Sequence, residues 1–322
     1  IGLVLSGYSI AALAIRFFSG YIVDRFSRKK VLLIGFASFA LFFLGYYFTF
    51  SLVLFAVIRT LHGAPFGLTS VSSSTVAIDV LPSKRRGEGI GYWGLSNNFA
   101  MAVGPSLSLW IFTHYDNYNI LFTVSLVTAL IGLLINTTVD CKYRPPVLDK
   151  KKMSLDRFIM LEGWSQGLCI ALVAVAYGVL STYIAIYSQD VLNITAGTGT
   201  FFMLFAVGLI MSRFFGVRYL SKGFVVRNAT YGVICVAIGY SLFAFWQNLY
   251  GYYISAVVIG FGQGSMYPAV QTMFLNMASN DKRGTANATI LTCWDLGVGI
   301  GIIGGGYVAE HLGGYNSAFL MS

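Results

Sequence analysis

Charged side chains are scarce in this sequence. Asp, Glu, Lys and Arg together make up only 10% of its 322 residues, while 57% are hydrophobic and the mean hydropathy is +0.73. A water-soluble domain usually carries about 25% charged residues, so this composition excludes one and predicts a polytopic membrane protein. Because backbone groups in hydrocarbon must hydrogen-bond within their own segment, we expect an all-α fold.

Cysteine is rare as well, and catalytic motifs are missing. The four cysteines, Cys141, Cys169, Cys235 and Cys293, form no Cys-x-x-Cys pair, which argues against a disulfide framework or a zinc site. The sequence contains no His-Glu-x-x-His, no Gly-x-Ser-x-Gly and no nucleotide-binding P-loop. We therefore expect no enzyme activity, no metal or cofactor, and no ATP-driven step in this chain.

Long apolar runs are what the sequence has in abundance. A helix needs about 20 mostly apolar residues to cross a bilayer, and division of the chain by that length predicts ten complete helices. Their expected ranges are 1–22, 31–50, 52–78, 86–113, 119–139, 160–187, 197–218, 226–246, 249–277 and 284–309.

Lys and Arg are distributed unevenly between the loops. Eighteen of the 21 basic residues lie in every second loop, and the alternate loops contain none. Loops rich in Lys and Arg stay on the cytoplasmic side, which predicts the orientation of the chain. The pI of 9.3 therefore reflects topology, because cations spread over short loops do not form a nucleic-acid-binding face. Only Arg16, Arg59 and Arg213 lie well inside the apolar runs, because Arg86, Arg218 and Arg227 are at run ends beside the basic loops.

The chain also repeats itself at an offset of 197 residues. Ungapped pairs at this offset are Arg16 and Arg213, Gly63 and Gly260, Gly67 and Gly264, Arg86 and Arg283, and Gly104 and Gly301. Internal repeats of this kind indicate duplicated structural units. The repeat predicts two pseudo-symmetric halves, residues 1–139 and 160–322, joined by a cytoplasmic linker at 140–159.

The same offset predicts helices beyond both ends of this sequence. The helix at 160–187 pairs with one that would precede residue 1, and the helix at 119–139 pairs with one at 316–336. We therefore expect the complete protein to have six helices in each half. The first helix and most of the twelfth would lie outside this sequence.

One short stretch packs five charges into seven residues between the first two runs: Gly20-Tyr-Ile-Val-Asp24-Arg25-Phe-Ser-Arg28-Lys29-Lys30. It resembles the loop after the second helix of major facilitator superfamily transporters, and the stretch from Asp79 to Arg86 resembles the loop that mirrors it. The resemblance covers nearly the whole chain and implies two six-helix halves related by an axis along the membrane normal. It also implies a conformational latch at the inner face, formed by Gly20, Asp24, Arg25, Arg28, Asp79, Arg85 and Arg86.

Polar residues inside the apolar runs are the candidate substrate and proton site, because a charge at membrane depth is costly and is usually functional. Arg59-Thr-Leu-His62-Gly resembles the superfamily's Arg-x-x-Gln-Gly pattern, which implies a part in proton coupling; a structural Arg and a packed neutral imidazole are the alternatives. Asp295, the only acidic residue deep within a run, is expected to bind substrate or a proton, or to form a structural ion pair. The remaining candidates are Asn97, Asn98, Trp294, Gln263 and Tyr267.

The stretch Ala100-Met-Ala-Val-Gly104-Pro105-Ser-Leu-Ser108 bears on the direction of transport. Its small residues favour close helix packing, and it resembles the Gly-Pro motif of proton-coupled antiporters, with Ala100 and Ser108 in place of glycines. The resemblance implies alternating-access transport of a small organic solute, coupled to protons, with drug or metabolite export favoured. The alternative is a proton-coupled uptake symporter for a sugar, organic acid or peptide.

The expected partners follow from this assignment. They are a small-molecule substrate, protons and membrane lipid, and no nucleic acid. We expect a monomer in a bacterial inner membrane with its basic loops in the cytoplasm. A receptor on the same scaffold would bind its ligand without moving it.

Overall fold

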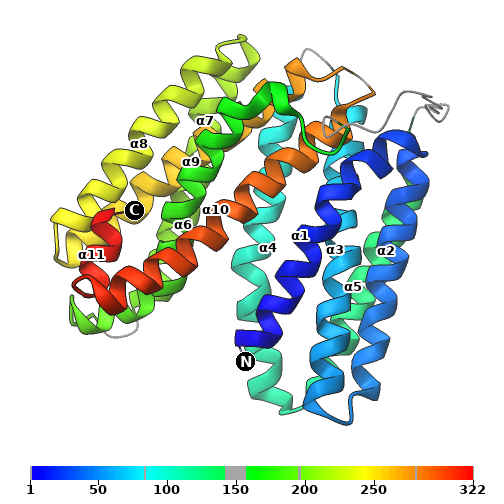
Figure 1. Ribbon diagram of the computed structural model, residues 1–322, viewed down its shortest axis with the longest axis horizontal. Helices are drawn as coiled ribbons and strands as arrows, with labels where there is room; N and C mark the ends of the chain where they lie inside the picture. Colours follow the sequence, from blue (N-terminus) through cyan, green and yellow to red (C-terminus); the bar gives the residue numbers. More distant parts are fainter. Residues whose placement is uncertain (1, 83–84, 142–156, 195–196, 280, 322) are drawn as a thin grey trace. The chain divides into compact units, whose positions relative to one another are not determined.

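The computed structural model describes residues 2–82, 85–141, 157–194, 197–279 and 281–321, most of which are helical (Figure 1). Ten long helices follow the ten predicted runs to within a few residues at each end. They are α1 (Gly2–Arg25), α2 (Arg28–Gly45), α3 (Leu52–Val80), α4 (Arg86–Tyr115), α5 (Tyr118–Thr138), α6 (Trp164–Asp190), α7 (Gly197–Ser221), α8 (Val225–Phe245), α9 (Leu249–Met277) and α10 (Arg283–His311). The short elements are η1 (Tyr46–Phe48), η4 (Leu161–Gly163) and α11 (Gly314–Met321). The predicted all-α fold is confirmed.

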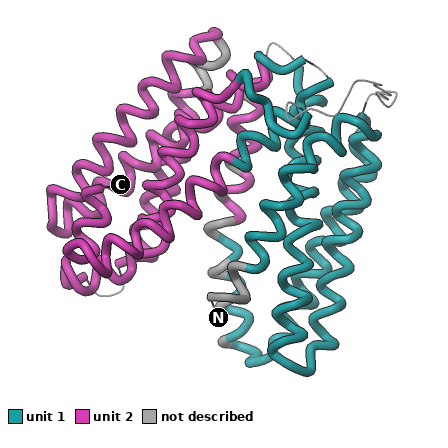
Figure 2. The backbone as a smooth tube through the Cα atoms, in the orientation of Figure 1, with its two compact units in different colours: residues 1–82, 103–162, 277–292 teal, residues 83–102, 163–276, 293–322 magenta. Residues whose placement is uncertain are grey.

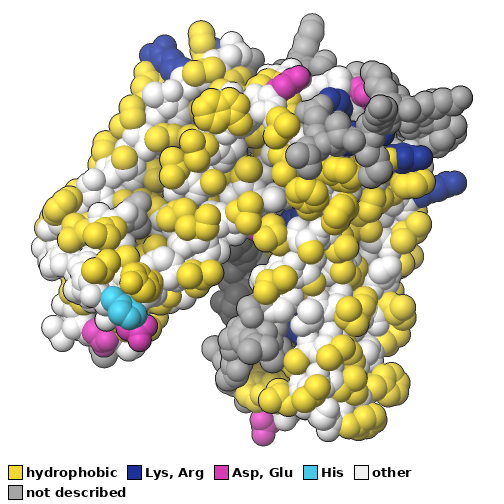
Figure 3. Space-filling view, viewed as in Figure 1, with side chains coloured by type: hydrophobic (Ala, Val, Ile, Leu, Met, Phe, Trp, Pro, Cys, Tyr) yellow, Lys and Arg dark blue, Asp and Glu magenta, His cyan; other side chains and the backbone are white. Residues whose placement is uncertain are grey.

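The surfaces of these helices suit a lipid environment. Seven helices in the described part of the chain are long and apolar enough to cross a membrane. Hydrophobic side chains cover much of the visible flanks of each unit (Figure 3), and Ile303 on α10 is 77% exposed. Such exposure would be unfavourable in water and is favourable against acyl chains.

Polar side chains define several helix ends. The side chains of Ser51 and Asn117 accept hydrogen bonds from the first turns of α3 and α5, at 3.2 and 2.8 Å. Capping of this kind satisfies backbone N–H groups that have no partner within the helix. At the other end of α5, Lys29 Nζ donates to the backbone carbonyls of Thr137 and Val139, at 2.8 and 2.7 Å.

The chain forms two compact units (Figure 2). Unit 1 contains residues 1–82, 103–162 and 277–292, and unit 2 contains residues 83–102, 163–276 and 293–322. The two halves predicted above rest on duplication in the sequence, whereas these units are defined by contacts in space. The halves therefore remain a prediction. Most of the predicted linker lies outside the described residues, at 142–156.

Each unit contains one copy of the same helix packing. In unit 1, a Cβ added to Gly63 would lie 2.1 Å from the Tyr8 carbonyl oxygen, which means that α3 touches the backbone of α1. In unit 2, a Cβ on Gly260 would lie 2.1 Å from the Phe205 carbonyl oxygen, so α9 touches α7 in the same way. The offset of 197 residues relates Gly63 to Gly260 and Tyr8 to Phe205. Small residues at these crossings allow the backbones to meet.

Candidate functional site

Asp24 forms the centre of a polar cluster in unit 1. Its Oδ1 accepts from the backbone N–H of Gly284 at 2.8 Å, and its Oδ2 accepts from the backbone N–H of Thr285 at 2.7 Å and from the Thr285 hydroxyl at 3.0 Å. These N–H groups belong to the first turn of α10, where a helix has unsatisfied donors and a partial positive charge. Asp24 on α1 therefore caps α10 from another helix.

Two arginines and a second carboxylate complete this cluster. Arg28 donates to Asp24 Oδ1 at 2.7 Å and also to Asp79 Oδ2, and Arg283 donates to Asp79 Oδ1 at 3.1 Å. The Arg28 side chain is only 8% exposed, and those of Asp24 and Asp79 are 10% and 18% exposed. Sheltered pairs are screened far less than surface pairs, so this network is coupled to the docking of α10. We call Asp24, Arg28, Asp79 and Arg283 the inner network.

Gly20 brings α1 and α10 close enough for these bonds. A Cβ at Gly20 would lie 2.7 Å from the Thr285 Cα and 2.9 Å from the Gly284 carbonyl oxygen. A Cβ at Gly284 would lie 2.8 Å from the Gly20 carbonyl oxygen. Any side chain larger than hydrogen at either position would hold the helices apart. The role of Gly20 in the predicted latch is therefore to allow α1 and α10 to approach closely.

Further bonds hold the first turns of α10 in unit 1. The buried Asn287 side chain donates to the Val71 carbonyl at 3.3 Å and also to the Ser74 hydroxyl, both on α3. The Thr289 hydroxyl accepts from the Met160 backbone N–H at 2.9 Å. Beside these bonds, Val23, Val31, Val71 and Ala288 form a small apolar core.

The turn before α10 carries one more carboxylate. A hydrogen bond from the Ser279 side chain, the largest influence, holds the pKa of the exposed Asp281 below its ordinary value, and the positive charges of Lys282 and Arg28 add to this effect. Asp281 is therefore an anion at neutral pH.

The other predicted latch residues are Arg25, Arg85 and Arg86. The Arg25 side chain lies over the Tyr21 ring, 5.6 Å from its centroid, and donates to the Tyr21 hydroxyl. Arg86 is the first residue of α4 and Arg85 directly precedes it, both in unit 2. The structure thus brings together Gly20, Asp24, Arg28 and Asp79, and their role as a latch remains a prediction.

His62 lies in an aromatic core of unit 1 and is only 1% exposed. Its Nδ1 is 2.8 Å from the Tyr46 hydroxyl, to which Arg59 donates at 3.4 Å. The Arg59 guanidinium also lies 4.2 Å from the centroid of the Tyr8 ring, a favourable cation–π geometry. Ring contacts to His62 come from Tyr8, Phe39, Phe42, Phe43 and Tyr46. This environment fits the packed neutral imidazole named above as an alternative.

Candidates from the second half lie in unit 2. The Trp294 ring meets Tyr267 edge-on at 5.5 Å and Tyr177 at 5.4 Å between centroids, so α10, α9 and α6 share an aromatic cluster. Asp295 follows Trp294 on α10 and is partly buried. Gln263 is 6% exposed, and its Nε2 has no hydrogen-bond partner among the described residues.

The remaining candidates are on α4. Asn97 is exposed in unit 2, and the side chain of Asn98 lies outside the described residues, as does that of Pro105. No described atom lies within 4 Å of a Cβ added at Gly104, so a packing role for Gly104 remains a prediction. Close packing of this type occurs instead between α10 and α6, where a Cβ at Gly301 would lie 2.1 Å from the Val175 carbonyl oxygen.

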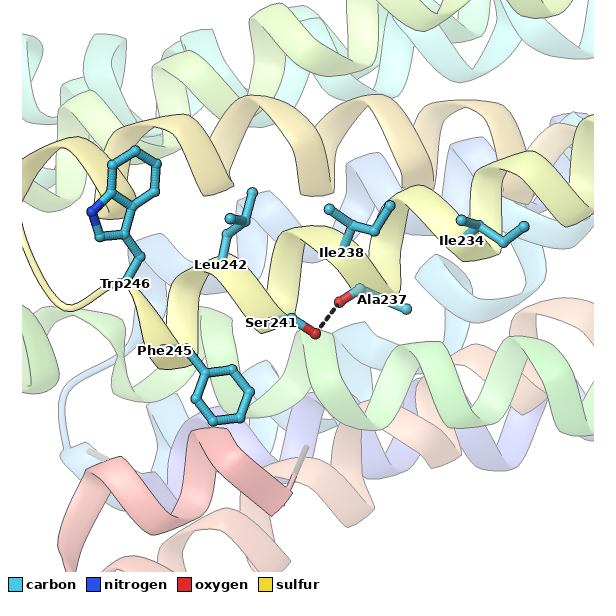
Figure 4. Close-up of a pocket in the computed structure, with 7 residues that line it drawn as sticks. All are labelled: Ile234, Ala237, Ile238, Ser241, Leu242, Phe245 and Trp246. Atoms are coloured by element: carbon cyan, nitrogen blue, oxygen red, sulfur yellow. Dashed lines mark hydrogen bonds between the residues drawn. The ribbon is translucent and has the colours of Figure 1, made fainter.

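One surface depression in unit 2 does not resemble a solute site. Its volume is about 580 Å³, and it lies along one face of α8 in unit 2 (Figure 4). Its lining residues are Ile234, Ala237, Ile238, Ser241, Leu242, Phe245 and Trp246. Because α8 and the residue directly after it, Trp246, supply the whole lining and none of it is charged, we interpret it as lipid-facing surface.

The predicted site omitted several residues that the structure places in these clusters. Arg283 belongs to the inner network, Gly284 and Thr285 donate to its Asp24, and Arg213 is buried in unit 2. The repeat contained a signal for the first two, because Arg283-Gly284 matches Arg86-Gly87. No sequence pattern indicated that Arg283 would meet Asp79, or that Gly284 would meet Asp24, some 204 and 260 residues away.

Known proteins resemble this chain over nearly its whole length. The profile of the Major Facilitator Superfamily matches residues 1–302 and, in a second match, residues 229–322. The chain is 25% identical to the staphylopine export protein of Staphylococcus aureus, over 94% of this chain and 78% of that protein. It is 32% identical to a Na⁺, Li⁺, K⁺/H⁺ antiporter of Planococcus maritimus, over 47% of this chain and 37% of that protein.

Its fold is also similar to that of a solved structure. The human organic anion transporter MFSD10 superimposes with a TM-score of 0.84 at 16% identity, covering 99% of this chain and 80% of that one. At this identity the likeness concerns the fold alone.

Proposed function

Because the chain belongs to the Major Facilitator Superfamily, we propose that it exports a small organic solute in exchange for protons. It is a multi-pass membrane transporter and not an enzyme. Two observations support export: the similarity to an export protein and to a proton antiporter, and the Gly104-Pro105 stretch on α4. The class of solute, the direction of its transport and its coupling to protons are all parts of this proposal.

The capping of α10 by Asp24 is the observation that carries the mechanism. We infer that this contact forms in a state closed to the cytoplasm and breaks when that side opens. Breaking it exposes two N–H groups of α10 and separates Arg283, on α10, from Asp79, on α3. Water and cytoplasmic ions would then solvate these groups, so the two states differ by a modest free energy. A transporter needs such a balance, because both states must be visited in each cycle.

Transport in liposomes tests the proposal. Full-length protein is reconstituted with a pH-sensitive dye inside, a pH gradient is imposed, and a solute panel is offered that includes staphylopine, Na⁺, Li⁺ and K⁺. We expect at least one solute to move against the proton flow, with a dye response that requires the solute. Movement of solute and protons in the same direction would instead favour the symporter. Proton-independent flux, or saturable binding without flux, would contradict the proposal.

Labelling from outside the cell tests the proposed orientation. Phe50, 87% exposed between α2 and α3, lies in a loop without basic residues, and Lys222, exposed after α7, lies in a basic loop. In a variant without the four native cysteines, Phe50→Cys should react with an impermeant thiol reagent on intact cells. Lys222→Cys should react only after the membrane is opened. The opposite pattern would reverse the orientation.

The remaining parts of the proposal concern the cellular setting. We propose a monomer surrounded by lipid in a bacterial cytoplasmic membrane. Bacterial relatives support the location. A single chain is sufficient in principle, because the two halves of this fold already alternate about one site.

A further inference from the structure

Arg213 is a buried cation for which the described residues provide no anion. It lies on α7 in unit 2 and is 9% exposed. Its Nη1 donates to the Gly264 carbonyl on α9 at 2.9 Å, and that is its one hydrogen bond among the described residues. The Nε is buried without an acceptor, and Nη2 faces the bare backbone of α4, 3.2 Å from where a Cβ of Gly94 would be. A guanidinium at membrane depth is costly unless its charge and donors are satisfied.

The repeat supplies a comparison for this arginine. Arg16 occupies the equivalent position on α1, and its Nε donates to the Ser70 hydroxyl at 3.1 Å while its Cζ lies 5.4 Å from the centroid of the Phe66 ring. At the offset of 197 residues, Phe66 corresponds to Gln263 and Ser70 corresponds to Tyr267. The first half therefore offers Arg16 a ring and a hydroxyl. The second half places a polar amide where that ring stands.

The two halves are also equivalent in how their helix backbones cross near these arginines. A Cβ at Gly67 would lie 2.5 Å from the Ala12 carbonyl oxygen, and a Cβ at Gly264 would lie 3.0 Å from the Leu209 carbonyl oxygen. These two contacts are also related by the repeat. Arg213 donates to the carbonyl of Gly264, the residue after Gln263. Because α9 crosses α7 as α3 crosses α1, we infer that the side chain at 263 lies beside Arg213 as Phe66 lies beside Arg16.

Gln263 adds a second unsatisfied donor at this place. Its Nε2 is buried without an acceptor, like Arg213 Nε. Two donors and a positive charge call for a ligand with negatively charged oxygen atoms. A carboxylate fits best, because a planar guanidinium binds its two oxygens in parallel. We propose that Arg213 and Gln263 bind a carboxylate group of the transported solute. This assignment rests on the proposed transport of a small organic solute and specifies its charge.

Ligand-dependent stability tests the assignment without any gradient. The probes are acetate and benzoate, with acetamide and benzamide as neutral analogues of the same shape, all at matched ionic strength. Full-length protein in detergent should unfold at a higher temperature with the carboxylates than with the amides. Arg213→Gln should weaken the apparent affinity for benzoate by roughly tenfold or more, and Gln263→Leu should weaken it by a smaller factor. Arg16→Gln is the matched control and should leave the benzoate affinity unchanged.

A third variant supplies the missing anion from within the chain. Gln263→Glu should raise the unfolding temperature of the free protein and remove the effect of benzoate, because the new carboxylate would occupy the site. This result does not depend on the folding of Arg213→Gln. Equal protection by carboxylates and amides, equal loss in Arg16→Gln and Arg213→Gln, or protection by chloride alone would overturn the assignment. Binding that persists without proton-driven flux would instead contradict the proposed export while leaving this site in place.

Discussion

Asp24→Asn should shift the protein away from the state in which α10 is docked on α1, and should lower turnover more than substrate affinity. The Asp24 carboxylate accepts four hydrogen bonds, one from Arg28, one from Gly284 and two from Thr285. Removing one partner of a buried pair costs about 3–5 kcal/mol, and Asn retains one acceptor oxygen. We therefore expect a shift on the order of tenfold in the equilibrium between states. Affinity should change little, because the residue acts on the conformational step.

Spin-label distances measure this shift. Lys30, in the first turn of α2, and Lys222, directly after α7, are both exposed. Labels at Lys30→Cys and Lys222→Cys would report the separation of the predicted cytoplasmic ends. The population at the shorter distance should fall in Asp24→Asn. Asp140→Asn is the matched control, because it removes an exposed carboxylate, shortly after α5, that is not part of the inner network. Populations equal to wild type in Asp24→Asn would leave Asp24 with no part in a latch.

Gly20→Ala tests the same contact by size instead of charge. The added methyl group would meet the Thr285 Cα at 2.7 Å, and backbone atoms there cannot rotate away. The charges of the inner network stay in place, so a shift in this variant would come from helix separation alone. Agreement between Gly20→Ala and Asp24→Asn would show that docking of α10, and not net charge, controls the equilibrium.

Asp295→Asn should abolish proton-driven accumulation while downhill exchange of a neutral solute continues. A gradient of one pH unit supplies about 1.4 kcal/mol per proton, enough for roughly tenfold accumulation when one proton is exchanged per cycle. Without a titratable group at this depth, accumulation should fall to equality across the membrane. If the solute is a cation, the same substitution should instead weaken binding, because its counter-charge has been removed.

Accumulation in liposomes at several pH values measures this effect. Glu310→Gln is the matched control, because it neutralises an exposed carboxylate near the end of the same helix, α10. We expect the control to behave as wild type. An Asp295→Asn protein with wild-type pH dependence and affinity would make Asp295 structural and place the coupling carboxylate elsewhere.

The sequence by itself determined the helices and their duplication. Apolar runs of bilayer length predicted α1 to α10 closely, because hydrocarbon permits backbone groups few alternatives to helical hydrogen bonds. Loop charges predicted the orientation, which remains to be tested. The offset of 197 residues predicted the equivalence of α1–α3 and α7–α9, and the close contacts of Gly63 and Gly260 share its register.

Only the tertiary structure decided which polar residues meet. The resemblance grouped Arg25 with Asp24, yet Arg25 turns to Tyr21, while the carboxylate of Asp24 reaches the first turn of α10. His62 resembled a titratable group in the sequence and lies among aromatic rings. Composition and spacing act along the chain, whereas burial and hydrogen bonding depend on neighbours that arrive from distant segments. Arg16 and Arg213 occupy equivalent positions in the sequence repeat, but the hydrogen-bond partners and rings that surround them differ.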